Sequence, residues 1–176
     1  MSNLKPAVNS NDHIQGTATA FLELVEYGDY QCPHCGHAYP IIKKVQRQLG
    51  ADLKFIFRNF PLSEIHPDAF NAAVAAEAAG LQNKFWEMHD IIFENQRALD
   101  IESLFAYAAK IGLDLKLFKE DIQKTGISSK VEQDFESGIR SGVNGTPSFF
   151  IGGKKYNESW EANELIQYLK SQLALR

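Results

Sequence analysis

The chain has 176 residues, of which 44% are hydrophobic and 23% charged, and its formal net charge is −4. This composition is typical of a globular protein with one domain, or with one domain that carries an insertion. Lys and Arg are scattered along the chain. That distribution argues against nucleic acid or an anionic membrane surface as the main partner.

No apolar run reaches the roughly 18 residues of a membrane span, so no membrane insertion is expected. The first twenty residues contain no apolar stretch like that of a secretory signal. For the chain as given we therefore expect a cytoplasmic location. A periplasmic or exported location is the alternative if a signal has been removed. With two cysteines, stability must come from packing and not from a disulfide scaffold.

The N-terminal part of the chain alternates between strand and helix patterns. Residues 1–11 have little to bury, which predicts a flexible arm, and residues 12–15 can form a short edge strand. A run of β-formers predicts a central strand over residues 20–27, which ends at a turn signal. Apolar residues at helical spacing predict a helix over residues 37–49, with Pro40 as a kink, and another strand follows at residues 53–58.

The middle of the chain is helical and its end returns to strand. Helices are predicted over about 67–80, 84–95, 100–112 and 128–141, with a short one from residue 114; strands over 148–151 and 154–156; and a last helix from about 161. This order predicts an α/β fold, in which residues 12–62 and 142–176 build a mixed sheet covered by helices. Residues 63–141 form an inserted helical subdomain.

Both cysteines lie in one motif, Cys32-Pro33-His34-Cys35, between a predicted strand and a predicted helix. Unpaired N–H groups at the start of the helix favour a thiolate on Cys32, and Pro33 suits the first helical position. His34 can donate a hydrogen bond or a positive charge to that thiolate, which would make the disulfide more oxidising. Cys35, one turn further, should be buried and act as the resolving thiol. The motif therefore predicts thiol–disulfide exchange.

Other interpretations of the motif stay open. Two cysteines at this spacing can form half of a zinc site, with His37 as a third ligand, but no second pair exists and we expect no metal. A zinc-holding or redox-switched binding module is the alternative of another class. A glutathione-dependent transferase or isomerase would use one nucleophile, which Cys35 argues against. His66 and His89 have no ligand pattern around them.

With Gly145-Thr146-Pro147 downstream, before another strand, the cysteine motif resembles the thioredoxin superfamily. More narrowly, it resembles the DsbA-like thiol–disulfide oxidoreductases, whose usual active-site sequence is this same Cys-Pro-His-Cys. The resemblance covers about residues 12–173. It implies a thioredoxin-like fold with a helical insertion and an enzyme that oxidises protein thiols. A thioredoxin-like disulfide reductase or isomerase in the cytoplasm is the alternative.

The resemblance also assigns roles to further residues. It implies no cofactor beyond the Cys32–Cys35 disulfide, and as partners it implies protein substrates and a redox protein that regenerates the pair. Pro147 matches the family's cis-proline, and Thr146, where the best-known DsbA has Val, would pair with a substrate strand. We expect Thr146, Pro147 and Pro33 to contact substrate.

Glu26 lies six residues before Cys32 and matches the family's buried acidic residue. By strand alternation it shares a face with Leu22 and Leu24, so an apolar setting would raise the pKa of its carboxyl group. Such a group can relay a proton to or from Cys35. The alternative is an ordinary strand carboxylate that faces solvent.

Overall fold

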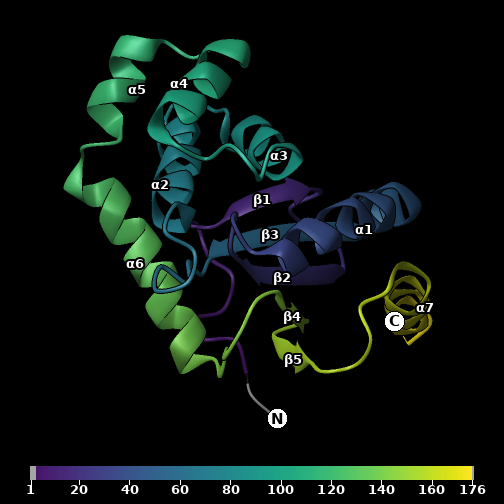
Figure 1. Cartoon of the computed structure of the whole chain (residues 1–176). Helices are drawn as coiled ribbons and strands as arrows, with labels where there is room; N and C mark the ends of the chain where they lie inside the picture. Colours follow the sequence, from purple (N-terminus) through teal and green to yellow (C-terminus); the bar gives the residue numbers. More distant parts are fainter. Residues whose placement is uncertain (1–2, 176) are drawn as a thin grey trace.

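The computed structural model describes residues 3–175, which form one five-stranded sheet covered by helices (Figure 1). The strands are β1 (His13–Gly16), β2 (Leu22–Gly28), β3 (Leu53–Asn59), β4 (Ser148–Ile151) and β5 (Lys154–Tyr156). The helices are α1 (Pro33–Leu49), α2 (Ala69–Gly80), α3 (Phe85–Glu94), α4 (Ile101–Lys110), α5 (Leu115–Asp121), α6 (Thr125–Arg140) and α7 (Ala162–Leu173), with a 3₁₀ turn at Gly50–Asp52. The predicted α/β class is confirmed.

The sheet has the order β1-β3-β2-β4-β5 and is mixed. Strand β2 runs parallel to β3 and antiparallel to β4, while β1 pairs antiparallel with β3 at one edge. Both long central strands are buried on both faces along most of their length, although each carries two charged residues. The predicted edge strand therefore exists as β1, and β2 is central as expected.

Alternate residues of β2 enter two different cores. Leu22 and Leu24 pack with α1, α2, α3 and α7 in the larger core. Val25 and Tyr27 pack in a smaller core on the opposite face, where Phe135 of α6 also contributes. Helices α2–α6 follow β3 in the chain and share the larger core with the sheet (Figure 1). Whether residues 63–141 fold as a separate subdomain stays a prediction.

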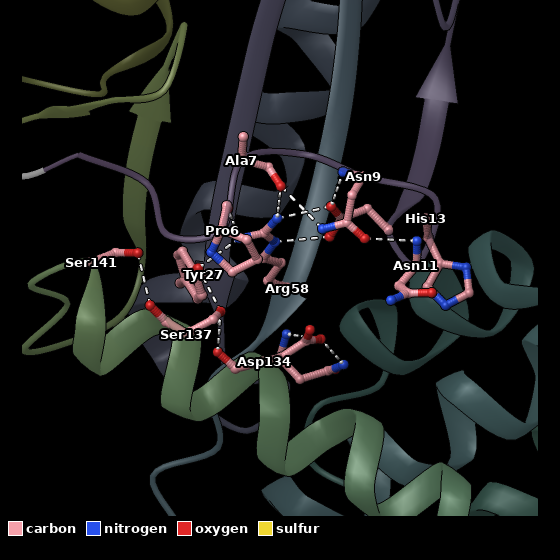
Figure 2. A network of polar contacts seen from close by, with 12 residues as sticks. Pro6, Ala7, Asn9, Asn11, His13, Tyr27, Arg58, Asp134, Ser137 and Ser141 are labelled. Carbon is pink, nitrogen blue, oxygen red and sulfur yellow. Dashed lines mark hydrogen bonds and ion pairs between the residues drawn. The ribbon is translucent and has the colours of Figure 1, made fainter.

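The start of the chain differs from the expected flexible arm. Within the described residues 3–11, Leu4 is 7% exposed and its N–H donates to the carbonyl of Gly153 at 2.8 Å. The buried Arg58 guanidinium binds the Asp12 carboxylate at 2.8 Å. It also donates to the carbonyl oxygens of Pro6 and Ala7 (Figure 2). A buried charge requires such partners, so the arm prediction is corrected for residues 3–11, and residues 1–2 lie outside the described part.

No helix within residues 3–175 combines the length and the apolarity needed to cross a membrane.

Candidate active site

The cysteine motif lies where β2 ends and α1 begins. Helix α1 starts at Pro33, four residues before the predicted start at residue 37. Pro33 occupies its first turn and Cys32 is its N-cap. Cys32 is 4% exposed and Cys35 is fully buried, and both are free thiols in this structure. Cys35 is therefore the more buried of the two residues, as predicted, although the difference is small.

The two thiols differ strongly in acidity. A hydrogen bond from the Cys35 thiol, helped by the backbone N–H groups of Cys35 and His34, lowers the pKa of Cys32 to about 5. Burial raises the pKa of Cys35 well above its usual value, and the neighbouring Cys32 and Glu26 raise it further. A negative charge at this site therefore resides on Cys32.

Glu26 lies in β2 at 3% exposure, in register with Phe57 of β3 and Phe149 of β4. Within the described residues its carboxyl group makes no hydrogen bond or ion pair. Burial, and to a smaller extent the charge of Cys32, raises the pKa of Glu26 to about 8. The structure thus places it on the apolar face, and the solvent-facing alternative does not hold. Its role as a proton relay stays a prediction.

The Thr146–Pro147 peptide bond is cis and lies against the motif. The Cys32 thiol donates to the carbonyl oxygen of Thr146 at 3.6 Å, so the structure brings these distant segments together. The hydroxyl Oγ1 of Thr146 is buried and has no hydrogen-bond partner among the residues that the structure describes. A hydroxyl in this position is available to a molecule that docks beside Cys32.

The structure places Pro33 and His34 on the surface, beside the buried cysteines. The His34 ring makes no hydrogen bond within residues 3–175, and its contribution to the Cys32 thiolate comes from its backbone N–H. His37 is exposed and lies 3.3 Å from Glu161. Among the described residues, no three His, Cys, Asp or Glu side chains are grouped to hold a metal.

Asp29 is a buried residue that the sequence interpretation missed. Its Oδ1 accepts the N–H groups of Gln31 at 2.7 Å and Cys32 at 3.1 Å, and its Oδ2 accepts the N–H of Leu62 at 2.8 Å. The Nδ1 atom of His66 lies 2.8 Å from the same Oδ2. The Gly28-Asp29 turn signal marked this position, because Asp side chains bond to backbone two or three residues further on.

Gln96, between α3 and α4, is a second missed residue. Its Nε2 donates to the carbonyl oxygens of Tyr30 at 2.8 Å and Cys32 at 2.9 Å. The Tyr30 hydroxyl also bonds to the buried His89 at 3.0 Å. No local sequence signal marks Gln96, since its partners are 64 and 66 residues away.

A groove of about 710 Å³ lies next to this site, between the loop after β3 and helix α6. Its connection to the motif is short, because Leu62 in the groove shares the Asp29 carboxylate with Cys32. Apolar side chains and three carboxylates line it: Leu62, Ile65, Phe70, Val131, Phe135, Glu64, Glu132 and Glu136.

The model of a family described as thioredoxin matches residues 8–171. The chain belongs to the thioredoxin family. It is 39% identical over 170 residues to the Na(+)/H(+) antiporter NhaA 1 of Mycobacterium sp. (strain KMS), and 37% identical over 169 residues to the NhaA of Herminiimonas arsenicoxydans. These matches cover 96% of the chain but 28% and 27% of the antiporters, so the chain spans about a quarter of the curated relatives' length.

Solved structures of thioredoxin-family proteins share the fold. BdbD from Bacillus subtilis superposes with a TM-score of 0.83 at 24% identity, covering 93% of this chain and 94% of BdbD. The thiol-disulfide exchange protein α-DsbA2 from Wolbachia pipientis gives 0.83 at 22% identity, covering 93% and 88%. A thioredoxin-like oxidoreductase from Silicibacter pomeroyi DSS-3 gives 0.84 at 22% identity, covering 96% and 95%. The predicted resemblance to DsbA-like proteins is confirmed, and at these identities it establishes the fold.

Proposed function

We propose that the chain is a thiol–disulfide oxidoreductase that oxidises cysteine pairs of polypeptides through Cys32 and Cys35. The observation that carries this proposal is the opposite direction of the two pKa shifts, with Cys32 lowered to about 5 and Cys35 raised. A stabilised Cys32 thiolate stabilises the reduced pair, which makes the disulfide a stronger oxidant.

The geometry supports a reaction in two exchanges. A substrate thiolate attacks the sulfur of Cys32 in the disulfide, the bond between Cys32 and Cys35 breaks, and Cys35 takes up a proton. Glu26, a buried acid whose charge acts on the Cys35 thiol, can supply that proton. A second substrate thiolate then attacks the substrate sulfur of the mixed disulfide and releases the Cys32 thiolate. Two electrons pass from the substrate to the cysteine pair, and a redox partner must remove them.

Two observations favour a polypeptide as substrate. The carbonyl oxygen of Thr146 lies 3.6 Å from the Cys32 sulfur, where an extended chain can pair with the backbone. Apolar side chains line the neighbouring groove, and one of them, Ile65, is 69% exposed and can contact a docking side chain. We propose thiol exchange, and not ion transport, for the region shared with the antiporters, because that region matches the thioredoxin family and makes up 28% of the antiporter.

The reduction potential of the Cys32–Cys35 pair tests the direction of the reaction. In glutathione redox buffers, a value of about −120 mV is expected for a DsbA-like oxidant. A value of about −270 mV would instead support the cytoplasmic reductase. A glutathione-dependent transferase would bind glutathione and react without Cys35, so Cys35→Ser with full turnover would contradict the proposal.

A further inference from the structure

Gln96 connects the inserted helices to the motif through one side-chain amide. Its Nε2 donates to two carbonyl oxygens of the active-site loop, those of Tyr30 at 2.8 Å and Cys32 at 2.9 Å. The Cys32 carbonyl also accepts the N–H of Gly36 at 3.0 Å, which is the first hydrogen bond of α1. Two donors therefore hold this one carbonyl group at the N-cap of the helix.

The orientation of this carbonyl bears directly on the reactive sulfur. Cys32 adopts φ −68° and ψ 124°, and this geometry presents the N–H groups of His34 and Cys35 to its sulfur. A donor on the Cys32 carbonyl also offsets the negative end of a dipole that lies close to the thiolate. Both effects favour the charged form of the sulfur over the neutral form.

Gly36 provides the space that Gln96 occupies. A Cβ atom at residue 36 would lie 2.0 Å from Oε1 of Gln96 and 2.7 Å from its Cδ, so a side chain there would push the Gln96 amide out of its present position. Glycine inside a helix costs about 1 kcal/mol relative to alanine. The glycine and the glutamine therefore form a matched pair, in which the missing side chain of one admits the amide of the other.

We propose that Gln96 is a positioning residue for the redox site, which holds the Cys32 carbonyl and thereby makes the Cys32–Cys35 disulfide more oxidising. This inference rests on the proposed thiol exchange and adds a residue from outside the motif.

The variant Gln96→Ala removes both hydrogen bonds. Titration of the Cys32 thiolate by its ultraviolet absorbance should show a pKa that rises by about 0.5 to 1 unit. The equilibrium constant for oxidation of glutathione should fall about 3- to 10-fold, which corresponds to about 15–30 mV. The matched control is Asn95→Ala, because the Asn95 side chain bonds to Ile91 and does not contact the motif. If Gln96→Ala folds poorly, Gln96→Met takes its place in both measurements, because methionine keeps the length of the side chain without the amide.

A double-mutant cycle separates positioning from general stability. Gly36→Ala should displace the Gln96 amide and reproduce the Gln96→Ala shift, and the double variant should shift no further. Additive shifts, or a thiolate titration in Gln96→Ala equal to that in Asn95→Ala, would overturn the inference. The titration measures the ionisation of Cys32 and does not depend on disulfide exchange. The proposed function fails separately, if the unaltered protein does not exchange disulfides.

Discussion

Arg58 and Glu26 are buried ionisable residues on neighbouring central strands, and they differ in their hydrogen-bond and ion-pair partners. Arg58 of β3 has a complete set of partners: the Asp12 carboxylate, the Tyr27 hydroxyl and two backbone carbonyls (Figure 2). Glu26 of β2 faces the other core and has none within the described residues. Burial alone would lower the pKa of Arg58, but Asp12 and Tyr27 raise it, so Arg58 stays charged, whereas burial favours the neutral form of Glu26.

This difference separates a structural charge from a reactive one. A fully paired buried charge keeps one protonation state and fixes the chain around it. A lone buried carboxyl group has a pKa close to the working pH, which suits proton transfer. The following experiments test whether Arg58 contributes to stability alone and whether Glu26 belongs to the reactive site.

The largest expected effect comes from Cys32→Ser, which removes the charge beside Glu26. Disulfide exchange should fall by more than about 10³-fold, since the remaining thiol, Cys35, is fully buried and its raised pKa keeps it protonated. The pKa of Glu26 should also fall below about 8, because the Cys32 charge contributes to raising it. Turnover assays and carboxyl NMR titration measure the two effects. Unchanged exchange would falsify the mechanism.

Arg58→Met should affect stability and leave the chemistry unchanged. The substitution leaves the Asp12 carboxylate buried without its partner, so the free energy of unfolding should fall by about 3–5 kcal/mol. Urea unfolding measures this loss. The potential of the cysteine pair should stay within about 10 mV of its original value. A large change in potential would mean that the two faces of the sheet are coupled.

In contrast to Arg58→Met, Glu26→Gln should raise the free energy of unfolding at pH 8. The pKa of Glu26 is raised from 4.5 to about 8, so the folded state holds a proton that the unfolded state releases in this window. The free energy of unfolding therefore falls as pH rises from 4.5 to 8. The variant should lack this fall and be more stable by about 4 kcal/mol at pH 8. Urea unfolding across this pH range measures the effect. If the free energy of unfolding of the variant changes with pH as steeply as that of the unaltered protein, the raised pKa does not belong to Glu26.

His66→Ala is expected to have the smallest effect. Asp29 would lose one contact but keep the N–H groups of Gln31, Cys32 and Leu62. The free energy of unfolding should change by less than about 1 kcal/mol, and the exchange rate by less than about twofold. A change in rate of tenfold or more would show that Asp29 belongs with Glu26 as a reactive group.

The sequence predicted what short spacings and strand alternation determine. The cysteine motif, the buried position of Glu26 and the α/β order follow from local patterns. The ordered segment before β1 was missed, because its stabilising partner Arg58 lies 46 residues beyond Asp12. Gln96 was missed for the same reason, and the His34 ring was given a contact that the structure supplies through the backbone. Residues that act through distant backbone groups leave no local signal.

The anchoring of residues 3–12 has a mechanical consequence. Leu4 is hydrogen bonded to the turn between β4 and β5, and Asp12 to Arg58 in β3. Tension applied at the start of the chain is therefore carried into the sheet at two points, on the face opposite Glu26. No hydrogen bond or ion pair within the described residues joins this segment to the loop that carries Cys32, so such a pull does not act directly on the reactive sulfur.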